Sequence, residues 1–413
     1  ASVQFRTSIA KVGSDRLEKS IQEGAALIDF QVFEDQGEKK FLAAVMKNVD
    51  GEIEYDLVVY NDRESVDAII LEYREMIQDD QADEDDILET GILAYEEIWE
   101  PLNDVLGEID YVYLIPDGAL NILPFNALVD GDEAYLIQSI DIHTLTSGRD
   151  LIPNDYELAR GKYLILAGPD YDSDKVVSAE NMAVAQGKRS ASLQVGIRGA
   201  GTGLRGLNFA PLPGAEQEGR VIIEQVVAGD GKSDDYFGND AQEKILSNMT
   251  VAPEILHIAT HGFFLKADDT LRKRLLKAAR STEVHVPPPG DNPLLRAGLA
   301  FAGINTNAQF LGDIETTNDG VLTALEVLDL NLSGTRLVVL SACETGLGEI
   351  HDGEGVYGLR RSFQEAGVAE VISSLWEVSD AGTQALMTDF YNKMLSGIPA
   401  REALRDVQLE MID

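Results

Sequence analysis

Two short apolar segments, each followed by a residue that can do chemistry, constrain the fold of this chain most. Residues 255–259 lead to Thr-His261-Gly, and residues 337–341 lead to Ala-Cys343. Apolar runs without a polar residue at every second position are typical of strands buried on both faces of a parallel sheet. Residues that follow such strands gather at the carboxyl edge of the sheet, where α/β proteins bind ligands. The sequence therefore predicts an α/β fold that brings His261 and Cys343 to one edge.

A cysteine and a histidine at one sheet edge can act as a nucleophile and its base. The thiolate is the reactive form of cysteine, and an imidazole can take the thiol proton and later give it to a leaving group. The N–H groups of Gly262 and Cys343 can bind an oxyanion, which is worth about 2.7–4 kcal/mol per donor. On composition alone a single cysteine is more often a small buried apolar residue, but the strand end and the glycines after it favour the nucleophile. No third group that orients the histidine is visible in the sequence.

The order of these motifs resembles the CHAT family of caspase-like cysteine proteases, which are related to caspases and separase in clan CD. The resemblance also rests on four further segments, 292–303, 322–326, 353–359 and 373–380. It covers residues 110–413, and more faintly 20–110. It implies a caspase-like three-layer α/β sandwich with a mostly parallel sheet, preceded by a degenerate, pseudo-caspase α/β half.

The resemblance implies a cysteine endopeptidase with a Cys-His dyad and no cofactor. In this interpretation Cys343 forms the acyl-enzyme, His261 is the acid and base, and Gly262 with the Cys343 amide forms the oxyanion hole. One cysteine and scattered histidines give no metal-ligand spacing, so no metal site is expected. Two alternatives stay open, a caspase-like interaction scaffold that does not cleave and a hydrolase of small esters that shares the dyad.

Acidic residues near the two strand ends predict cleavage after arginine or lysine. Asp380 matches a separase position at which an aspartate meets a basic substrate side chain. An N-cap of the helix that follows is an equally natural role for Asp380. The other candidate substrate-binding residues are Trp376, Glu377, Asp352 and Glu354.

Length and punctuation predict two domains. Residues 1–155 form a non-catalytic α/β region with three strands near residues 25–60 and a helix from Ile87 to about Gly107. Residues 156–413 form the catalytic domain. An insertion at about 265–320 and a Gly-rich loop at 169–211 are expected to be mobile until a partner orders them. His257, within its apolar strand, is expected to be a core histidine whose ring is satisfied by backbone groups.

The net charge of −39 bears on partners and surroundings. A strongly acidic chain lacks the basic surface that nucleic acids and anionic membranes require, so neither is an expected partner. The expected partners are a protein substrate and a regulatory protein or upstream repeat domain. The single cysteine suits a reducing compartment, so a cytoplasmic location is predicted.

Overall fold

The computed structural model contains two compact units. It describes residues 14–79, 81–152, 158–174, 208–264, 293–307, 319–341, 348–351, 355–375 and 380–412. We call one unit, which includes Tyr156–Glu349 and Tyr357–Ala400, the parallel-sheet unit. We call the other, which comprises Val3–Asp155, Ile350–Val356 and Arg401–Asp413, the mixed-sheet unit.

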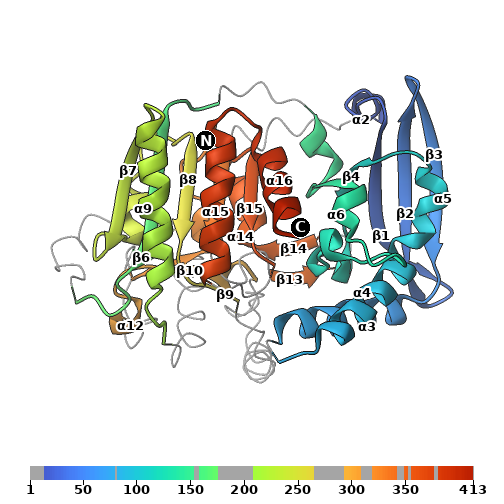
Figure 1. Ribbon diagram of the computed structural model, residues 1–413, viewed down its shortest axis with the longest axis horizontal. Helices are drawn as coiled ribbons and strands as arrows, with labels where there is room; N and C mark the ends of the chain where they lie inside the picture. Colours follow the sequence, from blue (N-terminus) through green and yellow to red (C-terminus); the bar gives the residue numbers. More distant parts are fainter. Residues whose placement is uncertain are drawn as a thin grey trace, which may run out of the picture. The chain divides into compact units, whose positions relative to one another are not determined.

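The mixed-sheet unit is built on five strands in the order β3-β2-β1-β4-β5 (Figure 1). The first three are the strands predicted near residues 25–60 and form an antiparallel meander, and β4 and β5 run parallel to β1. The strands are β1 Ala25–Asp35, β2 Glu38–Val49, β3 Glu52–Tyr60, β4 Tyr111–Ile115 and β5 Asp141–Thr144. The helices are α2 Ser14–Glu18, α3 Arg63–Gln78, α4 Glu84–Ile98, α5 Glu100–Leu106, α6 Leu136–Ser139 and α16 Ala400–Ile412, with 3-10 turns η1 Gly118–Ile122, η2 Phe125–Ala127 and η3 Gly148–Leu151.

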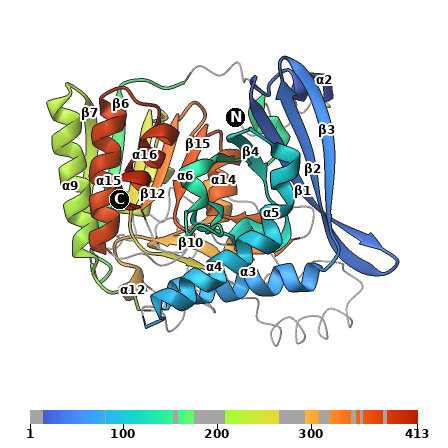
Figure 2. The same cartoon turned by 45° about the vertical axis from the view of Figure 1, so that its right-hand side comes forward.

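The parallel-sheet unit has five strands in the order β15-β12-β8-β6-β7, all parallel. They are β6 Lys162–Pro169, β7 Lys232–Gly238, β8 Ile255–Ala259, β12 Leu337–Ser341 and β15 Glu370–Ser373. Helices α9 (Pro213–Ala228) and α15 (Asp380–Leu395) lie side by side over one face (Figures 1 and 2). The predicted α/β fold with a mostly parallel sheet is confirmed.

Smaller elements complete the parallel-sheet unit. A three-stranded antiparallel sheet contains β9 Gly262–Phe264, β10 Ala297–Ala300 and β11 Val321–Thr323. Two further strands, β13 Gly348–His351 and β14 Gly355–Gly358, pair with each other, and each is divided between the two units. The short helices are α10 Glu243–Ser247, α12 Ile304–Asn307, α13 Ala324–Val327 and α14 Leu359–Glu365, with the 3-10 turn η5 Pro293–Leu295.

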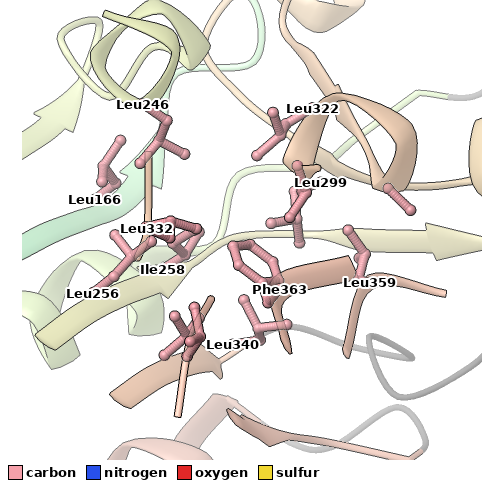
Figure 3. Close-up of a cluster of buried hydrophobic side chains, with 14 of the residues drawn as sticks. Leu166, Leu246, Leu256, Ile258, Leu299, Leu322, Leu332, Leu340, Leu359 and Phe363 are labelled. Atoms are coloured by element: carbon pink, nitrogen blue, oxygen red, sulfur yellow. The ribbon is translucent and has the colours of Figure 1, made fainter. Parts of the chain in front are cut away.

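A hydrophobic core packs against one face of the parallel sheet. The alternation of side chains along each strand determines which strand residues belong to it. In β8, Leu256 and Ile258 are fully buried against apolar residues of the short helices and of β10 (Figure 3). Those neighbours include Leu246, Leu299 and Phe363. Because neighbouring residues of a strand point to opposite faces, His257 faces the other layer.

The helix predicted from Ile87 to about Gly107 is two helices, α4 and α5, which meet at Trp99. Pro101 lies in the first turn of α5, where its missing N–H needs no partner. In a continuous helix the same proline would remove a hydrogen bond and crowd the preceding turn. The fully buried Trp99 indole holds the junction in the core.

The segment predicted as one insertion, 265–320, is only in part described. Residues 265–292 and 308–318 lie outside the described residues, as does most of the 169–211 loop. The described stretch between them is part of the core, because β10 forms the centre of its sheet and Phe301 and Ile304 are almost completely buried. The apolar run 294–304 carries this signal in the sequence.

The last helix, α16, is bound to the edge of the mixed sheet. Arg401 Nη1 donates to both carboxylate oxygens of Asp141 in β5, at 2.5 and 2.6 Å. The Arg401 guanidinium also lies over the Tyr111 ring, 4.9 Å from its centroid. Arg405 Nη2 donates to the carbonyl of Ile137 at 2.8 Å.

None of the described helices is long and apolar enough to cross a membrane.

Substitution of Arg401 by methionine is expected to lower the free energy of unfolding by about 1.5–3 kcal/mol. The change keeps an apolar stem but removes hydrogen bonds between charged groups that are about three-quarters buried. Arg361→Met is the matched control, because its helical pair with Glu365 is more exposed and should contribute under about 1 kcal/mol. Chemical denaturation measures both variants, and equal losses would contradict the anchoring role of Arg401.

Candidate active site

The carboxyl ends of β8 and β12 lie at one level of the sheet. The two strands pair in parallel, with Ala259 opposite Ser341. The pairing continues one residue further, because the N–H of Thr260 donates to the carbonyl of Ser341 at 3.2 Å. The chain that leads to His261 and the chain that leads to Cys343 therefore leave the sheet side by side.

The His261 imidazole is half-buried and has a defined hydrogen-bond partner. Its Nε2 atom is 2.8 Å from the backbone carbonyl oxygen of Ala210. A carbonyl can only accept, so Nε2 carries the hydrogen in this contact. In the neutral ring Nδ1 is then the basic nitrogen with a free lone pair. Ala210 thus supplies an orienting group that sequence reasoning missed.

Aromatic side chains surround the imidazole. The ring of Tyr171 lies 5.2 Å from that of His261, and the ring of Phe209 lies 5.5 Å from it. Phe209 also packs against Phe263, with 6.0 Å between the ring centroids. These rings restrict the rotation of the imidazole and limit the access of water to one side of it.

The backbone of His261 is fixed on both sides. Tyr171 Oη is 3.0 Å from Thr260 Oγ1, and the Thr260 hydroxyl donates to the carbonyl of Ala300. The tyrosine hydroxyl is therefore the donor to Thr260, and its oxygen accepts the N–H of His261 at 3.3 Å. On the other side the N–H of Ala300 donates to the carbonyl of His261 at 2.9 Å.

The N–H of Gly262 points away from β10. Gly262 lies opposite Leu299 in the antiparallel pair of β9 and β10. The hydrogen bond from Ala300 N–H to the His261 carbonyl flanks this pair, which makes it a non-hydrogen-bonded pair of the ladder. In such a pair each N–H faces outward, and within the described residues β9 is the edge strand of its sheet. The Gly262 N–H is thus directed to a side where no described strand accepts it.

Most other predicted site residues lie outside the described residues. These are Cys343, Asp352, Glu354, Trp376 and Glu377. Asp380 is described at backbone level, as the first residue of α15. Of the predicted site residues, the structure therefore describes His261, Gly262 and the backbone of Asp380, which lies at the start of α15. The assignment of Cys343 as nucleophile stays a prediction.

The predicted core histidine, His257, is completely buried, and its partners are side chains. Its Nδ1 is 3.1 Å from Tyr391 Oη in α15, and its Nε2 is 2.9 Å from a carboxylate oxygen of Glu218 in α9. Glu218 and Tyr391 are buried as well. Burial, and secondarily the Glu218 charge, raises the pKa of Tyr391 well above its ordinary value. This buried trio joins α9 and α15 to β8.

Two further residues near His261 had weak signals in the sequence. Tyr171 comes two residues after β6, at the same carboxyl edge as β8, and that position was its signal. Phe209 lies at the end of the Gly-rich stretch and has no periodic pattern.

In the described residues no group of three or more His, Cys, Asp or Glu side chains is arranged to hold a metal ion.

The comparison with protein families agrees with this arrangement. The model of the CHAT domain matches residues 89–413, which is most of the chain. The chain belongs to the CHAT domain family. The CHAT domain is a caspase-like domain of clan CD, so the predicted caspase-like α/β fold is confirmed for this chain.

Two curated relatives of this CHAT domain are named as tetratricopeptide repeat proteins. Human tetratricopeptide repeat protein 28 is 26% identical over 302 residues, which cover 72% of this chain and 11% of the relative. The mouse protein of the same name is 26% identical over 196 residues, or 48% of this chain and 8% of the relative. The chain thus spans about a tenth of the length of these relatives.

Proposed function

We propose that this CHAT domain is a cysteine endopeptidase that cleaves a protein substrate through Cys343 and His261. The observation that carries the proposal is the hydrogen bond from His261 Nε2 to the Ala210 carbonyl, which leaves Nδ1 as the base. Cys343 follows Ser341 by two residues, so covalent geometry keeps its Cα within about 8 Å of the end of β12. His261 follows Ala259, the partner of Ser341, by the same number of residues.

The reaction follows from these groups. His261 Nδ1 takes the proton of the Cys343 thiol, and the thiolate sulfur bonds to the scissile carbonyl carbon. The resulting oxyanion accepts hydrogen bonds from the N–H of Gly262 and of Cys343. The imidazolium then protonates the leaving amine as the C–N bond breaks. A water molecule attacks the thioester with His261 as its base, and the acid product and the thiol are released.

A labelling experiment tests this proposal against the non-cleaving scaffold. A peptidyl acyloxymethyl ketone with arginine before the reactive group alkylates an activated cysteine, and mass spectrometry locates the adduct. The expected result is a thioether on Cys343 together with cleavage in a mixed peptide library. Binding of peptides with neither adduct nor cleavage would support the scaffold. Turnover of small esters without cleavage of peptides would support the ester hydrolase.

We further propose that the enzyme cleaves after arginine or lysine, with Asp380 as the residue that recognises the basic side chain. A carboxylate can form a two-pronged pair with arginine, whereas an aspartate substrate would create a pair of like charges. Trp376, Glu377, Asp352 and Glu354 would line the same region. The negative charge of the chain also attracts a basic segment, over the ~8–10 Å beyond which salt screens the interaction.

Asp380→Asn is expected to lower kcat/KM for an arginine peptide about tenfold to a hundredfold, which corresponds to the loss of one charged hydrogen-bonded pair. Cleavage of an otherwise identical norleucine peptide should change little. Asp389→Asn is the matched control, because this exposed residue of the same helix undergoes the same change of charge. If Asp380 serves only to stabilise the start of α15, its variant loses thermal stability and keeps the arginine preference.

Regulation by an upstream repeat domain or by a partner protein is part of the proposal. The support is the name of the two relatives and the small share of their length that this chain matches. A catalytic thiol requires a reducing environment, and on that ground we propose that the enzyme works in the cytoplasm.

A further inference from the structure

One side-chain amide holds the chain segment that carries the Ala210 carbonyl. The N–H of Phe209 donates to Asn305 Oδ1 at 2.9 Å. Asn305 Nδ2 donates back to the carbonyl of Phe209, also at 2.9 Å. The two bonds close a ring, in the way that two strands pair, one residue before Ala210.

Further hydrogen bonds hold Asn305 itself in place. Its second N–H donates to a carboxylate oxygen of Asp172 at 2.9 Å, and the backbone N–H of Asn305 donates to the carbonyl of Tyr171 at 3.0 Å. An N–H group can only donate and a carboxylate here accepts, so the partners fix which amide atom is oxygen and which is nitrogen. Both amide hydrogens are used, and the side chain has a single favourable orientation.

The support beneath Asn305 is tightly packed. Ile304 is almost completely buried, and the N–H of Phe301 donates to the carbonyl of Gly320 at 2.7 Å. Gly320 has a φ of +88°, and a side chain there would come within 2.9 Å of the Ile304 nitrogen. Glycine at this position therefore permits the close approach of the two chain segments. Asn305 is presented from a rigid base, which precise positioning requires.

The Phe209 segment depends on this support because it has few other hydrogen bonds. Residues 208–212 belong to no helix or strand, and Pro211 has no N–H. Among the described residues, no backbone-to-backbone hydrogen bond involves Phe209 or the nitrogen of Ala210. What holds the segment is the Asn305 amide, the packing of the Phe209 ring and the His261 contact itself.

We propose that Asn305 is a positioning residue for catalysis. By clamping Phe209 it sets the Ala210 carbonyl against Nε2, and thereby keeps the His261 ring turned with Nδ1 toward the nucleophile. The inference rests on the proposed function for its catalytic consequence. The geometric part concerns only described residues, so it can be tested without any substrate.

Two readouts test the proposal in the full chain, one spectroscopic and one kinetic. A ring N–H of a half-buried histidine exchanges rapidly with water unless it is hydrogen-bonded, so the His261 Nε2–H resonance reports the Ala210 contact. In Asn305→Ala we expect this resonance to disappear and kcat to fall about a hundredfold, as for misplaced catalytic groups, with KM little changed. Asn305→Asp keeps the acceptor for Phe209 but loses the donors, and it should behave similarly if Asn305→Ala fails to fold.

Thr306→Val is the matched control. The Thr306 hydroxyl donates to the carbonyl of Asp172 at 3.2 Å from the same short helix, whereas the hydrogen bonds to the backbone of Phe209 described above come from Asn305. This variant should keep both the resonance and kcat, whereas equal losses would mean that only the general packing of α12 matters and would overturn the proposal. A retained resonance in Asn305→Ala and Asn305→Asp would overturn it too, whatever the activity. If Asn305→Ala loses the resonance but the parent protein cleaves nothing, the clamp is supported and the proposed protease function is refuted instead.

Discussion

Substitution of His261 by alanine is expected to lower kcat/KM for any peptide that the parent protein cleaves by a factor on the order of 10⁴ to 10⁶. Cys343→Ala should have an effect of the same size, and the double variant should be no worse than either single one. The physical reason is that the base and the nucleophile act as a unit, so the loss of either removes the whole covalent route.

The folded state provides the control for this experiment. His261 is half-buried, and among the described residues its ring makes one polar contact, so the alanine variant should unfold within a few degrees of the parent. Cys343→Ser keeps the shape of the side chain but replaces the thiol by a weaker nucleophile, and it should also be inactive. Near-normal cleavage by the His261 or the Cys343 variant would refute the dyad.

The buried trio of Glu218, His257 and Tyr391 leads to the second large expected effect. His257→Leu alone is expected to destabilise the parallel-sheet unit by about 3–5 kcal/mol. It leaves the Glu218 carboxyl without its partner in a site from which water is excluded. Chemical denaturation followed by circular dichroism measures the loss, with a correction for any change in slope.

The matched comparison removes all three polar groups together. Glu218→Met, His257→Leu and Tyr391→Phe keep the approximate volume of each side chain and leave no unpaired polar group among them. This triple variant should be clearly more stable than His257→Leu alone, because apolar replacement of all members of a buried polar cluster leaves no group without a partner. A triple variant less stable than the single one would show that the trio makes a net contribution to stability.

The sequence located the sheet and the ends of its central strands because their signal is local. A buried parallel strand is an apolar run, and the residue after it must lie at the carboxyl edge, so His261 and Gly262 were predictable. The strand end and the family resemblance together indicated Cys343, and the resemblance supplied Asp380. Edge strands were missed for the opposite reason, since β7 and β5 are polar and half-exposed, and resemble loops.

The environment of His261 could not be predicted, because it is assembled from distant segments. Ala210, Tyr171 and Asn305 contribute a carbonyl, a hydroxyl and an amide, and no spacing in the sequence joins them. His143 shows the same limit from another side. Its sequence surroundings resemble a polar loop, yet it lies in β5 against the Tyr113 ring, and burial lowers its pKa.

The position of α16 in the mixed-sheet unit has a consequence for biosynthesis. The edge of that sheet at Asp141 is completed by Arg401, which the ribosome adds 260 residues later. The mixed-sheet unit, whose strands precede the parallel-sheet unit in the sequence, can therefore not reach its final structure until almost all of this chain has been made. This differs from the usual order, in which a domain folds before the one that follows it. A fragment that ends near residue 152 should show the difference, as an incomplete unit in which Tyr111 and Asp141 are open to solvent.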